Sequence, residues 1–383
     1  MLFLLTLVTT LGTVPGQISI KDQARVVWVG STWVEREQQS SHWEAAVHAL
    51  FPGKKIVWRN LGWSGDNVSG ESRSGFGSVE DGYKELLKQI KDLKPNLILV
   101  SYGFNEAFEG AKGIPTFKTK YARLLKDIKP LGAKIHLTGL QPVVAHPPEL
   151  VSLEVLDTQQ KQYNQAIQEV ALAAEVGFLP TTSLVLASPA LSSNGIHLTP
   201  EGYRNLVPGW VKMLGLNSLA LGFRAELAAN SKEGKGCVID EVNSSKDGNL
   251  TFQLRSNRLP IGTLPQGELV IGDLRNGTWE LREGKTVIAM AKSEEWAKGI
   301  PITLPGDRAQ METLRKEVAA KNQQFFYRWR PQNETYLFGF RKHEQGNNSK
   351  EIPEFDSHIE ALEKQIILFS QPKNHSLSLI RKD

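Results

Sequence analysis

The sequence predicts a three-layer α/β/α domain with a parallel sheet, followed by a small β-rich module and a helical C-terminal tail. Between Arg25 and about Leu214, short runs rich in Val, Ile and Leu alternate with longer amphipathic stretches. This alternation is typical of buried parallel strands joined by crossover helices. After Leu214, turns rich in Gly, Asn, Ser and Lys separate short strand-like runs, as in an antiparallel module. The 383 residues, of which 40% are hydrophobic, suffice for about two to three packed domains.

The α/β region is expected to alternate strands with helices in chain order. The expected strands are Arg25–Val29, Lys55–Trp58, Leu97–Ser101 and Lys134–Thr138. The expected helices are Val34–Phe51, Tyr83–Leu93, Thr116–Ile128 and Leu153–Ala174. A last helix begins at Thr199, an N-cap residue followed by Pro200 at the first helical position.

Short strands and then helices are expected in the rest of the chain. The strands are Leu250–Leu254, Glu268–Ile271, Thr278–Leu281 and Thr286–Ala291, with a hairpin tip at Glu283-Gly284-Lys285. Apolar residues at helical spacing predict two helices in the tail. The first contains Met311, Leu314 and Val318, and the second contains Phe355, Ile359, Leu362 and Ile366. We therefore divide the chain into a signal peptide (1–16), the α/β domain (22–216), the β-rich module (217–305) and the helical tail (306–383).

The start of the chain predicts export. Met1 to Val14 form an apolar stretch as long as the core of a secretory signal, but too short to span a bilayer. No basic residue precedes Lys21, so the positive region of such a signal is missing. The alternative is a buried first strand or a wrongly assigned start. We expect a secreted or periplasmic location.

Composition excludes several classes of protein. The 45 Lys and Arg residues nearly balance the 41 Asp and Glu residues, and no basic run appears, so nucleic acid is not an expected partner. The single cysteine, Cys237, excludes an internal disulfide framework and a cysteine-cluster metal site. The histidines are scattered, and we expect neither a metal nor another cofactor. No apolar run is long enough for a membrane span in the mature chain.

Four polar motifs follow the strands or precede the last helix. They are Gly30-Ser31-Thr32-Trp33, Asn60-Leu61-Gly62-Trp63-Ser64-Gly65-Asp66, Tyr102-Gly103-Phe104-Asn105-Glu106 and Asn194-Gly195-Ile196-His197. The carboxyl ends of parallel strands meet at one edge of a sheet, so these motifs are expected to converge. Acyl transfer needs a hydroxyl nucleophile, a base and donors for the oxyanion, and these residue types provide them.

In this order the motifs resemble those of the SGNH, or GDSL-like, hydrolase superfamily. The resemblance covers Arg25 to about Leu214 and implies a flavodoxin-like parallel sheet and carboxylic ester hydrolysis through an acyl-enzyme. It assigns the oxyanion hole to Gly62, Asn105 and the backbone amide of Thr32, and the general base to His197. The Ser and Asp of the family pattern are replaced by Thr32 and Asn194.

Both replacements affect the expected chemistry. The β-methyl group of Thr32 restricts its side chain and crowds an approaching carbonyl. Asn194 cannot stabilise a histidinium as a carboxylate does, and the same exchange costs serine proteases on the order of 10⁴ in kcat. Ser31 is an alternative nucleophile if the pattern is shifted by one residue. Glu106, Glu109 and Asp66 are the nearest carboxylates in sequence that would replace the missing acid, although each is more simply explained as structural.

Aromatic residues flank the motifs and fill part of the tail. Trp33, Trp63 and Phe104 form either an apolar or sugar-stacking substrate wall or part of the core. Residues 325–346 are dense in aromatic, Arg and amide side chains, which suits either docking of the tail onto the α/β domain or a contribution to a substrate cleft.

The resemblance implies an ester hydrolase with Thr32 as nucleophile and His197 as general base and acid, acting on a small-molecule or polysaccharide ester. Expected export favours an O-acetyl ester on an extracellular carbohydrate. The alternative is a catalytically impaired protein of the same fold that binds a glycan or a protein partner. A contact between Thr32 and His197 favours the enzyme, and a cleft filled by the tail favours the binding protein. A metal-dependent phosphoesterase lacks its carboxylate and histidine cluster.

Overall fold

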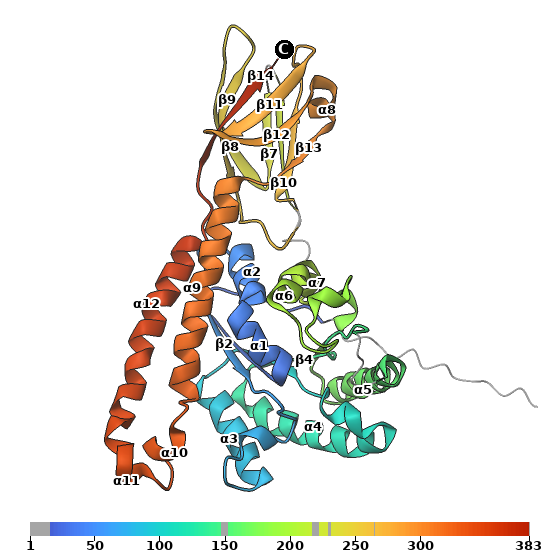
Figure 1. Ribbon diagram of the computed structural model, residues 1–383, viewed down its shortest axis with the longest axis vertical. Coiled ribbons are helices and arrows are strands. Elements are labelled where there is room, and N and C mark those ends of the chain that lie inside the picture. Colours follow the sequence, from blue (N-terminus) through green and yellow to red (C-terminus); the bar gives the residue numbers. More distant parts are fainter. Residues whose placement is uncertain (1–15, 147–151, 217–221, 229–230, 264, 383) are drawn as a thin grey trace, which may run out of the picture.

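The computed structural model describes residues 16–146, 152–216, 222–228, 231–263 and 265–382. The expected signal peptide lies outside these residues, except for Gly16. Figure 1 shows an α/β body, a β-rich module at one end of it, and a pair of long helices along its side. No helix in these ranges is both long enough and apolar enough to cross a bilayer.

The body is built on a five-stranded parallel sheet in the order β2-β1-β3-β4-β5. The strands are β1 (Ala24–Gly30), β2 (Ile56–Gly62), β3 (Leu97–Ser101), β4 (Lys134–Thr138) and β5 (Gly177–Leu179). The helices are α1 (Thr32–Ser40), α2 (His42–Leu50), α3 (Val79–Asp92), α4 (Ile114–Ile128), α5 (Leu153–Ala173), α6 (Pro200–Asn205) and α7 (Val207–Met213). Short 3-10 helices lie between them at Glu71–Arg73, Glu106–Glu109, Ala111–Gly113, Lys129–Leu131, Thr181–Ser183 and Pro189–Leu191. The expected α/β/α class is confirmed.

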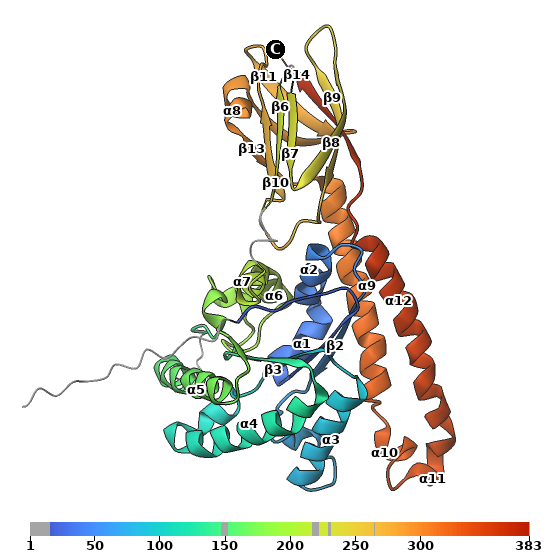
Figure 2. The same ribbon diagram turned by 180° about the vertical axis from the view of Figure 1, so that it is seen from behind.

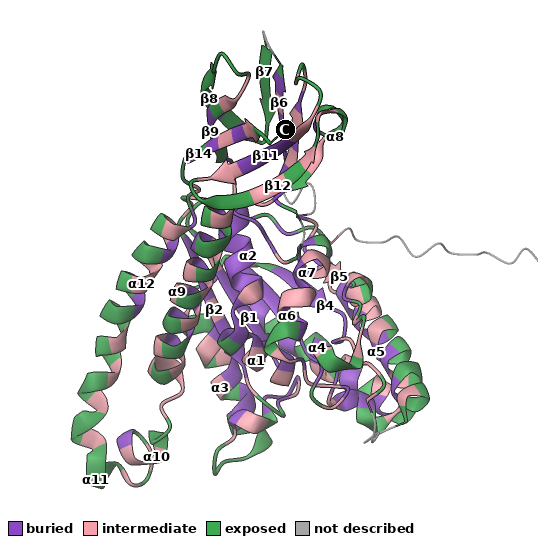
Figure 3. Cartoon of the chain, turned by 45° about the horizontal axis from the view of Figure 1, so that its top comes forward, coloured by how far each residue is buried: buried purple, intermediate pink, exposed green. Residues whose placement is uncertain are grey.

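Alternate residues of β1 serve two separate cores, because successive strand side chains point to opposite faces. Val26 and Trp28 pack with α1, α2, α6 and α7, and Val27 and Val29 pack with α3, α4 and α5. In the first core, Trp28 stacks on Trp210 with ring centroids 4.8 Å apart. Figure 3 shows that the sheet and the inner faces of these helices are buried.

The helix expected at Val34–Phe51 is wrong as a single element, because it breaks at Ser41. This residue has a left-handed backbone (φ 54°) and ends α1 before α2 begins at His42. The Ser41 hydroxyl donates to the carbonyl of Gln38 (2.6 Å), which replaces a helical hydrogen bond there. A polar side chain that bonds its own backbone in this way favours a break, but the apolar spacing on both sides concealed it.

Two sheets form the β-rich module. Their orders are β13-β10-β6-β7 and β12-β11-β14-β9-β8. The elements are β6 (Phe223–Ala228), β7 (Ser231–Lys235), β8 (Cys237–Ser244), β9 (Leu250–Ser256), β10 (Gly267–Ile271), β11 (Thr278–Glu283), β12 (Thr286–Lys292), α8 (Ser293–Lys298), β13 (Ile300–Ile302) and β14 (His375–Arg381). The tail was expected to contain two helices and no strand, but its described part ends in β14, which pairs with β9 and β11.

The tail between β13 and β14 is a helical hairpin. It contains α9 (Pro305–Trp329), α10 (Glu334–Leu337), α11 (Lys342–Gln345), a 3-10 segment (Gly346–Glu354) and α12 (Phe355–Phe369). Figure 2 shows α9 descending along the body and α12 returning beside it. Leu314 and Val318 of α9 are buried in the first core of the body, so the tail is part of the folded α/β unit.

A buried histidine joins the module to the tail. His375 of β14 lies 2.8 Å through Nε2 from Oδ1 of Asp307 in α9, and 2.6 Å through Nδ1 from Oε1 of Glu283 in β11. Burial lowers the pKa of His375, but hydrogen bonds and charge from the two carboxylates outweigh burial and raise it to about 8. The protonated imidazole therefore binds both carboxylates at neutral pH.

This histidine predicts a stability that falls in alkaline solution. A group whose pKa is raised on folding contributes fully below its unfolded pKa, and the contribution is lost as the pH passes its folded pKa. Between pH 6.5 and pH 9 we expect the free energy of unfolding to fall by about 2 kcal/mol through His375. Urea unfolding at the two pH values measures the change. His375→Gln is the control and should lose this part of the pH dependence; an identical dependence in both proteins contradicts the prediction.

Candidate active site

The candidate nucleophile lies where β1 turns into α1. Gly30 ends the strand, and a Cβ atom there would lie 2.7 Å from the carbonyl oxygen of Ser101, so only glycine fits. Ser31 is the N-cap residue of α1 and is 2% exposed, so a substrate cannot reach its hydroxyl. Thr32 is the first helical residue and is half-buried. The structure therefore favours Thr32 over the alternative Ser31.

The loop after β2 places a backbone amide on this threonine. The N–H of Gly65 donates to Oγ1 of Thr32 (3.2 Å). Gly65 has a φ of 76°, a conformation that glycine adopts without strain. The loop is fixed to β1 because the N–H of Trp63 donates to the carbonyl of Gly30 (3.0 Å). The oxyanion forms on the substrate carbonyl oxygen next to Oγ1, so an amide this close to Oγ1 is a candidate donor for it.

The prediction of Gly62 as an oxyanion donor is wrong. Its N–H donates to Oδ1 of Asn60 (2.8 Å), and it is still part of β2. A Cβ atom at Gly62 would lie 2.1 Å from the backbone nitrogen of Glu35, so this glycine is needed for close packing of α1 on the sheet. Gly65, three residues later, is the donor that sequence reasoning missed. Its position in a Ser-Gly-Asp turn beyond the strand was the available signal.

Asn105 lies beside the same loop. Its side-chain Nδ2 donates to the backbone carbonyl of Asp66 (2.7 Å), which holds it against the Gly65 turn. The amide has a second hydrogen on Nδ2, so one donor is left for a ligand. The backbone N–H of Thr32 is a further donor, because the first N–H groups of a helix have no partner within the helix. Thr32, Gly65 and Asn105 thus form a candidate oxyanion hole.

Two of the three nearby carboxylates, Asp66 and Glu106, are bonded to neighbours in these loops and not to His197. Asp66 is fully buried and accepts from Arg73 Nε (2.9 Å) and the Tyr102 hydroxyl (2.8 Å). Glu106 accepts from the backbone N–H groups of Val68 (2.9 Å) and Gly103 (3.0 Å). Burial raises the pKa of Glu106 to about 7.

The candidate base is held in a rigid loop before α6. Oδ1 of Asn194 accepts from the backbone N–H groups of His197 (2.8 Å) and Ile196 (3.2 Å). These two bonds fix the side-chain amide, so that its Nδ2 faces Nδ1 of His197 at 3.2 Å. Burial, and then the charge of Arg36, lower the pKa of His197, so the ring is neutral at pH 7.

This arrangement selects one tautomer of the imidazole. Nδ2 of Asn194 is a donor only, so Nδ1 of His197 must accept and the ring proton lies on Nε2. A base needs the opposite tautomer, with Nε2 free to take the proton of the nucleophile. Among the hydrogen bonds of the described residues, none joins Thr32 to His197. The site thus has the order of a catalytic triad, with a histidine set in the unproductive tautomer.

Of the two alternatives for the aromatic residues beside the motifs, substrate wall or core, the core applies to Trp33 and Phe104. Trp33 is 3% exposed and belongs to the core, where its ring meets Trp28 edge-on. Phe104 is 6% exposed. Trp63 is half-buried because the tail covers it: the Arg330 guanidinium lies 3.6 Å from its ring centroid.

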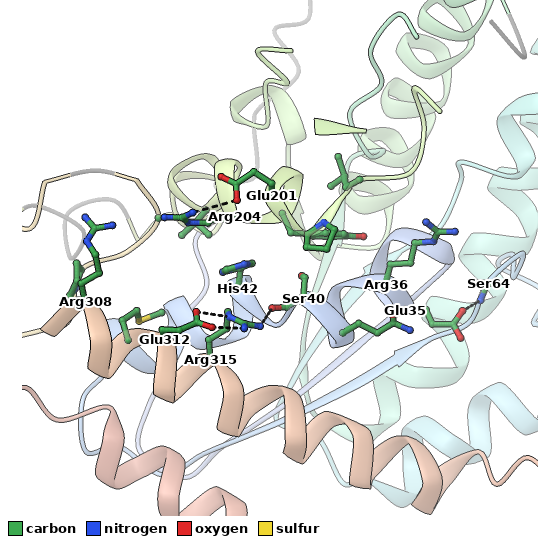
Figure 4. Close-up of a pocket in the computed structure, with 18 residues that line it drawn as sticks. Glu35, Arg36, Ser40, His42, Ser64, Glu201, Arg204, Arg308, Glu312 and Arg315 are labelled. Atoms are coloured by element: carbon green, nitrogen blue, oxygen red, sulfur yellow. Dashed lines mark hydrogen bonds and ion pairs between the residues drawn. The ribbon is translucent and has the colours of Figure 1, made fainter. Parts of the chain in front are cut away.

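The tail borders the site without filling it. Arg330 also forms an ion pair with Glu35 of α1 (2.8 Å). Beside this contact lies a cavity of about 970 Å³, lined by Ser64, by α1 and α6, and by α9 of the tail. Figure 4 shows the charged side chains that surround it. Within the described residues, no three His, Cys, Asp or Glu side chains gather as a metal site would require.

A parallel α/β sheet with these motifs along it is the arrangement that the SGNH resemblance implies. Residues 28–204 match the GDSL-like Lipase/Acylhydrolase family. This match covers most of the α/β domain, which is therefore similar to the lipases and acylhydrolases of that family. No curated protein sequence matches the chain.

The solved structures that match the chain cover different shares of it. A gut microbial diltiazem-metabolizing enzyme is 15% identical with a TM-score of 0.72, and the match covers 96% of this chain and 100% of that one. The module and the helical tail therefore recur in that protein. An acetylxylan esterase from Geobacillus stearothermophilus is 16% identical with a TM-score of 0.41, and covers 52% of this chain and 97% of its own. A GDSL-like lipase from Bacteroides thetaiotaomicron is 20% identical with a TM-score of 0.36, covering 51% and 88%.

Proposed function

We propose that the protein hydrolyses a carboxylic ester slowly, through an acyl-enzyme on Thr32. The main support is the Gly65 amide that points at Oγ1 of Thr32 (3.2 Å), at the start of α1. The orphan amides of the helix N-terminus add a favourable field for an oxyanion at this point. Donors fixed before the substrate binds are the largest single contribution in many acyl-transfer enzymes.

The reaction has two halves. Oγ1 of Thr32 attacks the ester carbonyl, and its proton passes to Nε2 of His197. The histidinium then protonates the leaving alkoxide as the acyl–threonine ester forms. In the second half, His197 takes a proton from water, the hydroxide attacks the acyl group, and Thr32 recovers its proton. Both halves need a His197 tautomer that Asn194 disfavours, which makes the reaction slow.

The substrate we propose is an O-acetyl ester of a carbohydrate, hydrolysed outside the cytoplasm. The cavity beside the site is lined by four arginines and three glutamates, which suits a polar, many-hydroxyl alcohol better than a lipid chain. A secreted or periplasmic location agrees with the apolar stretch at the start of the chain.

Substitutions at Thr32 and His197 test the mechanism. We expect Thr32→Ala and His197→Ala to reduce hydrolysis of p-nitrophenyl acetate to the rate without enzyme, because each removes an atom that the reaction needs. Thr32→Ser should raise kcat, since it removes the methyl group that crowds the carbonyl. Ser31→Ala is the matched control and should keep the native rate. Equal rates in wild type and Thr32→Ala would show that Thr32 is not the nucleophile.

A second candidate function is ligand binding without turnover. It is favoured by the Asn194 amide, which faces Nδ1 of His197 and sets the unproductive tautomer. If purified protein binds an acetylated oligosaccharide in calorimetry, and wild type and Thr32→Ala release acetate from it at the same rate, the protein is a binding protein.

A further inference from the structure

The cavity beside the candidate active site joins three parts of the chain. Its lining includes Ser64 and Leu198, the sequence neighbours of Gly65 and His197. The other walls come from α1, α6, the loop at Pro260–Gly262 and α9. A volume of about 970 Å³ is enough for a ligand of several sugar rings. Figure 4 shows Ser64 and Arg308 at opposite ends, so a ligand that reaches both extends away from the reacting group.

Two of the four arginines in this cavity are neutralised by neighbours. Arg315 forms an ion pair with Glu312 (2.6 Å) and donates to the carbonyl of Ser40 (3.0 Å). Arg204 forms an ion pair with Glu201 (3.4 Å). These pairs use two of the three glutamates that line the cavity.

The other two arginines, Arg36 of α1 and Arg308 of α9, have no described carboxylate within ion-pair distance. The remaining glutamate, Glu35, is already bonded to Arg330 and to the backbone N–H of Ser64. His42 also lines the cavity and adds no charge to it. Burial and then the charge of Arg315 lower the pKa of His42 to about 4, so the ring is neutral at pH 7. The cavity thus has two guanidinium groups without a counter-charge.

We propose that this cavity binds the carboxylate groups of an acidic oligosaccharide, the alcohol part of the ester, through Arg36 and Arg308. This inference rests on the proposed ester hydrolysis for the position of the acyl group, which would lie at the Thr32 end. A guanidinium offers two parallel N–H donors that match a carboxylate, and a partly enclosed site strengthens the pair. Because Arg308 belongs to α9, the helical tail takes part in substrate selection.

Calorimetry with the Thr32→Ala variant, which lacks the proposed nucleophile and so cannot turn over an ester ligand, tests the charge preference. We expect the protein to bind trigalacturonic acid and to bind its methyl ester, which has the same rings without the charges, on the order of tenfold more weakly or worse. Added salt should weaken binding of the acid and leave that of the methyl ester unchanged. Equal affinity for the two compounds, or no binding of the acid, would overturn the proposal.

Substitution of each of the two arginines tests whether this cavity binds the acid. Arg36→Gln and Arg308→Gln should each weaken binding of the acid on the order of tenfold and leave binding of the methyl ester unchanged. Arg255→Gln, on an exposed position of β9, is the matched control. If Arg36→Gln and Arg308→Gln bind the acid as the control does, the cavity is not the site. Binding of trigalacturonic acid does not depend on catalysis. If the protein binds this acid but hydrolyses no ester, only the proposed function is contradicted. If it hydrolyses esters but does not bind the acid, only this inference is contradicted.

Discussion

Asn194→Asp should raise kcat for ester hydrolysis by a factor on the order of 10² to 10⁴. In the present site, the Asn194 amide donates to Nδ1 of His197 and so keeps the proton on Nε2. A carboxylate at this position keeps the two backbone bonds to Ile196 and His197 through one oxygen. Its other oxygen accepts from Nδ1–H, which frees Nε2 as a base and stabilises the histidinium. Initial rates on p-nitrophenyl acetate measure the change.

Two controls make this result specific. Asn194→Ala removes the donor without supplying an acceptor, so it should not reproduce the gain. Adding Thr32→Ala to Asn194→Asp should abolish the new activity, because the freed base would have no nucleophile. If Asn194→Asp is no faster than the wild type, the tautomer of His197 does not limit the reaction.

The largest effect on stability is expected at Lys321, which joins α9 to the body. Its ammonium group is 1% exposed and donates to Glu44 Oε1 (2.6 Å), the Trp58 carbonyl (3.0 Å) and Asn322 Oδ1 (2.8 Å). Lys321→Met leaves the Glu44 charge buried without its cation. We expect the free energy of unfolding to fall by about 3–5 kcal/mol, measured by urea unfolding at pH 7.

Matched variants separate charge from packing. Lys316→Met changes an exposed lysine on the same helix and should alter stability by less than about 0.5 kcal/mol. Glu44→Gln combined with Lys321→Met removes both charges and should recover part of the loss. A double variant no more stable than Lys321→Met would contradict the explanation by a stranded charge.

The sequence was sufficient for four of the five strands of the α/β body, all except β5, because their signals are local. Runs such as Leu97–Ser101 and Lys134–Thr138 are buried on both faces and coincide with β3 and β4. The motifs at the strand ends converge because parallel strands must end at one edge. The loops that contain Thr32, Gly65 and Asn105 do meet, through the bonds of Gly65 to Thr32 and of Asn105 to Asp66, whereas the place of His197 in one site with them stays a prediction.

The parts that were not predicted depend on contacts between distant residues. Gly62 and Gly65 differ because the side-chain oxygen of Asn60 accepts the N–H of Gly62. Only the N–H of Gly65 therefore faces Thr32. Both glycines fit the motif, so spacing alone could not separate them. The strand β14 was missed because its partners β9 and β11 lie far from it in sequence. Alternating residues such as Leu377 and Leu379 were the only local signal.

The position of β14 determines when the β-rich module can form during synthesis. This strand lies in the middle of its sheet, between β11 and β9, and follows the helical hairpin in the chain. Until residues 375–381 leave the ribosome, β9 and β11 each present an unpaired edge, the kind of surface that invites wrong pairing between chains. The α/β body, complete by residue 216 apart from its contacts with the tail, is free to fold first. The α9–α12 hairpin, packed on that folded body, then delivers the final strand to the gap in the sheet.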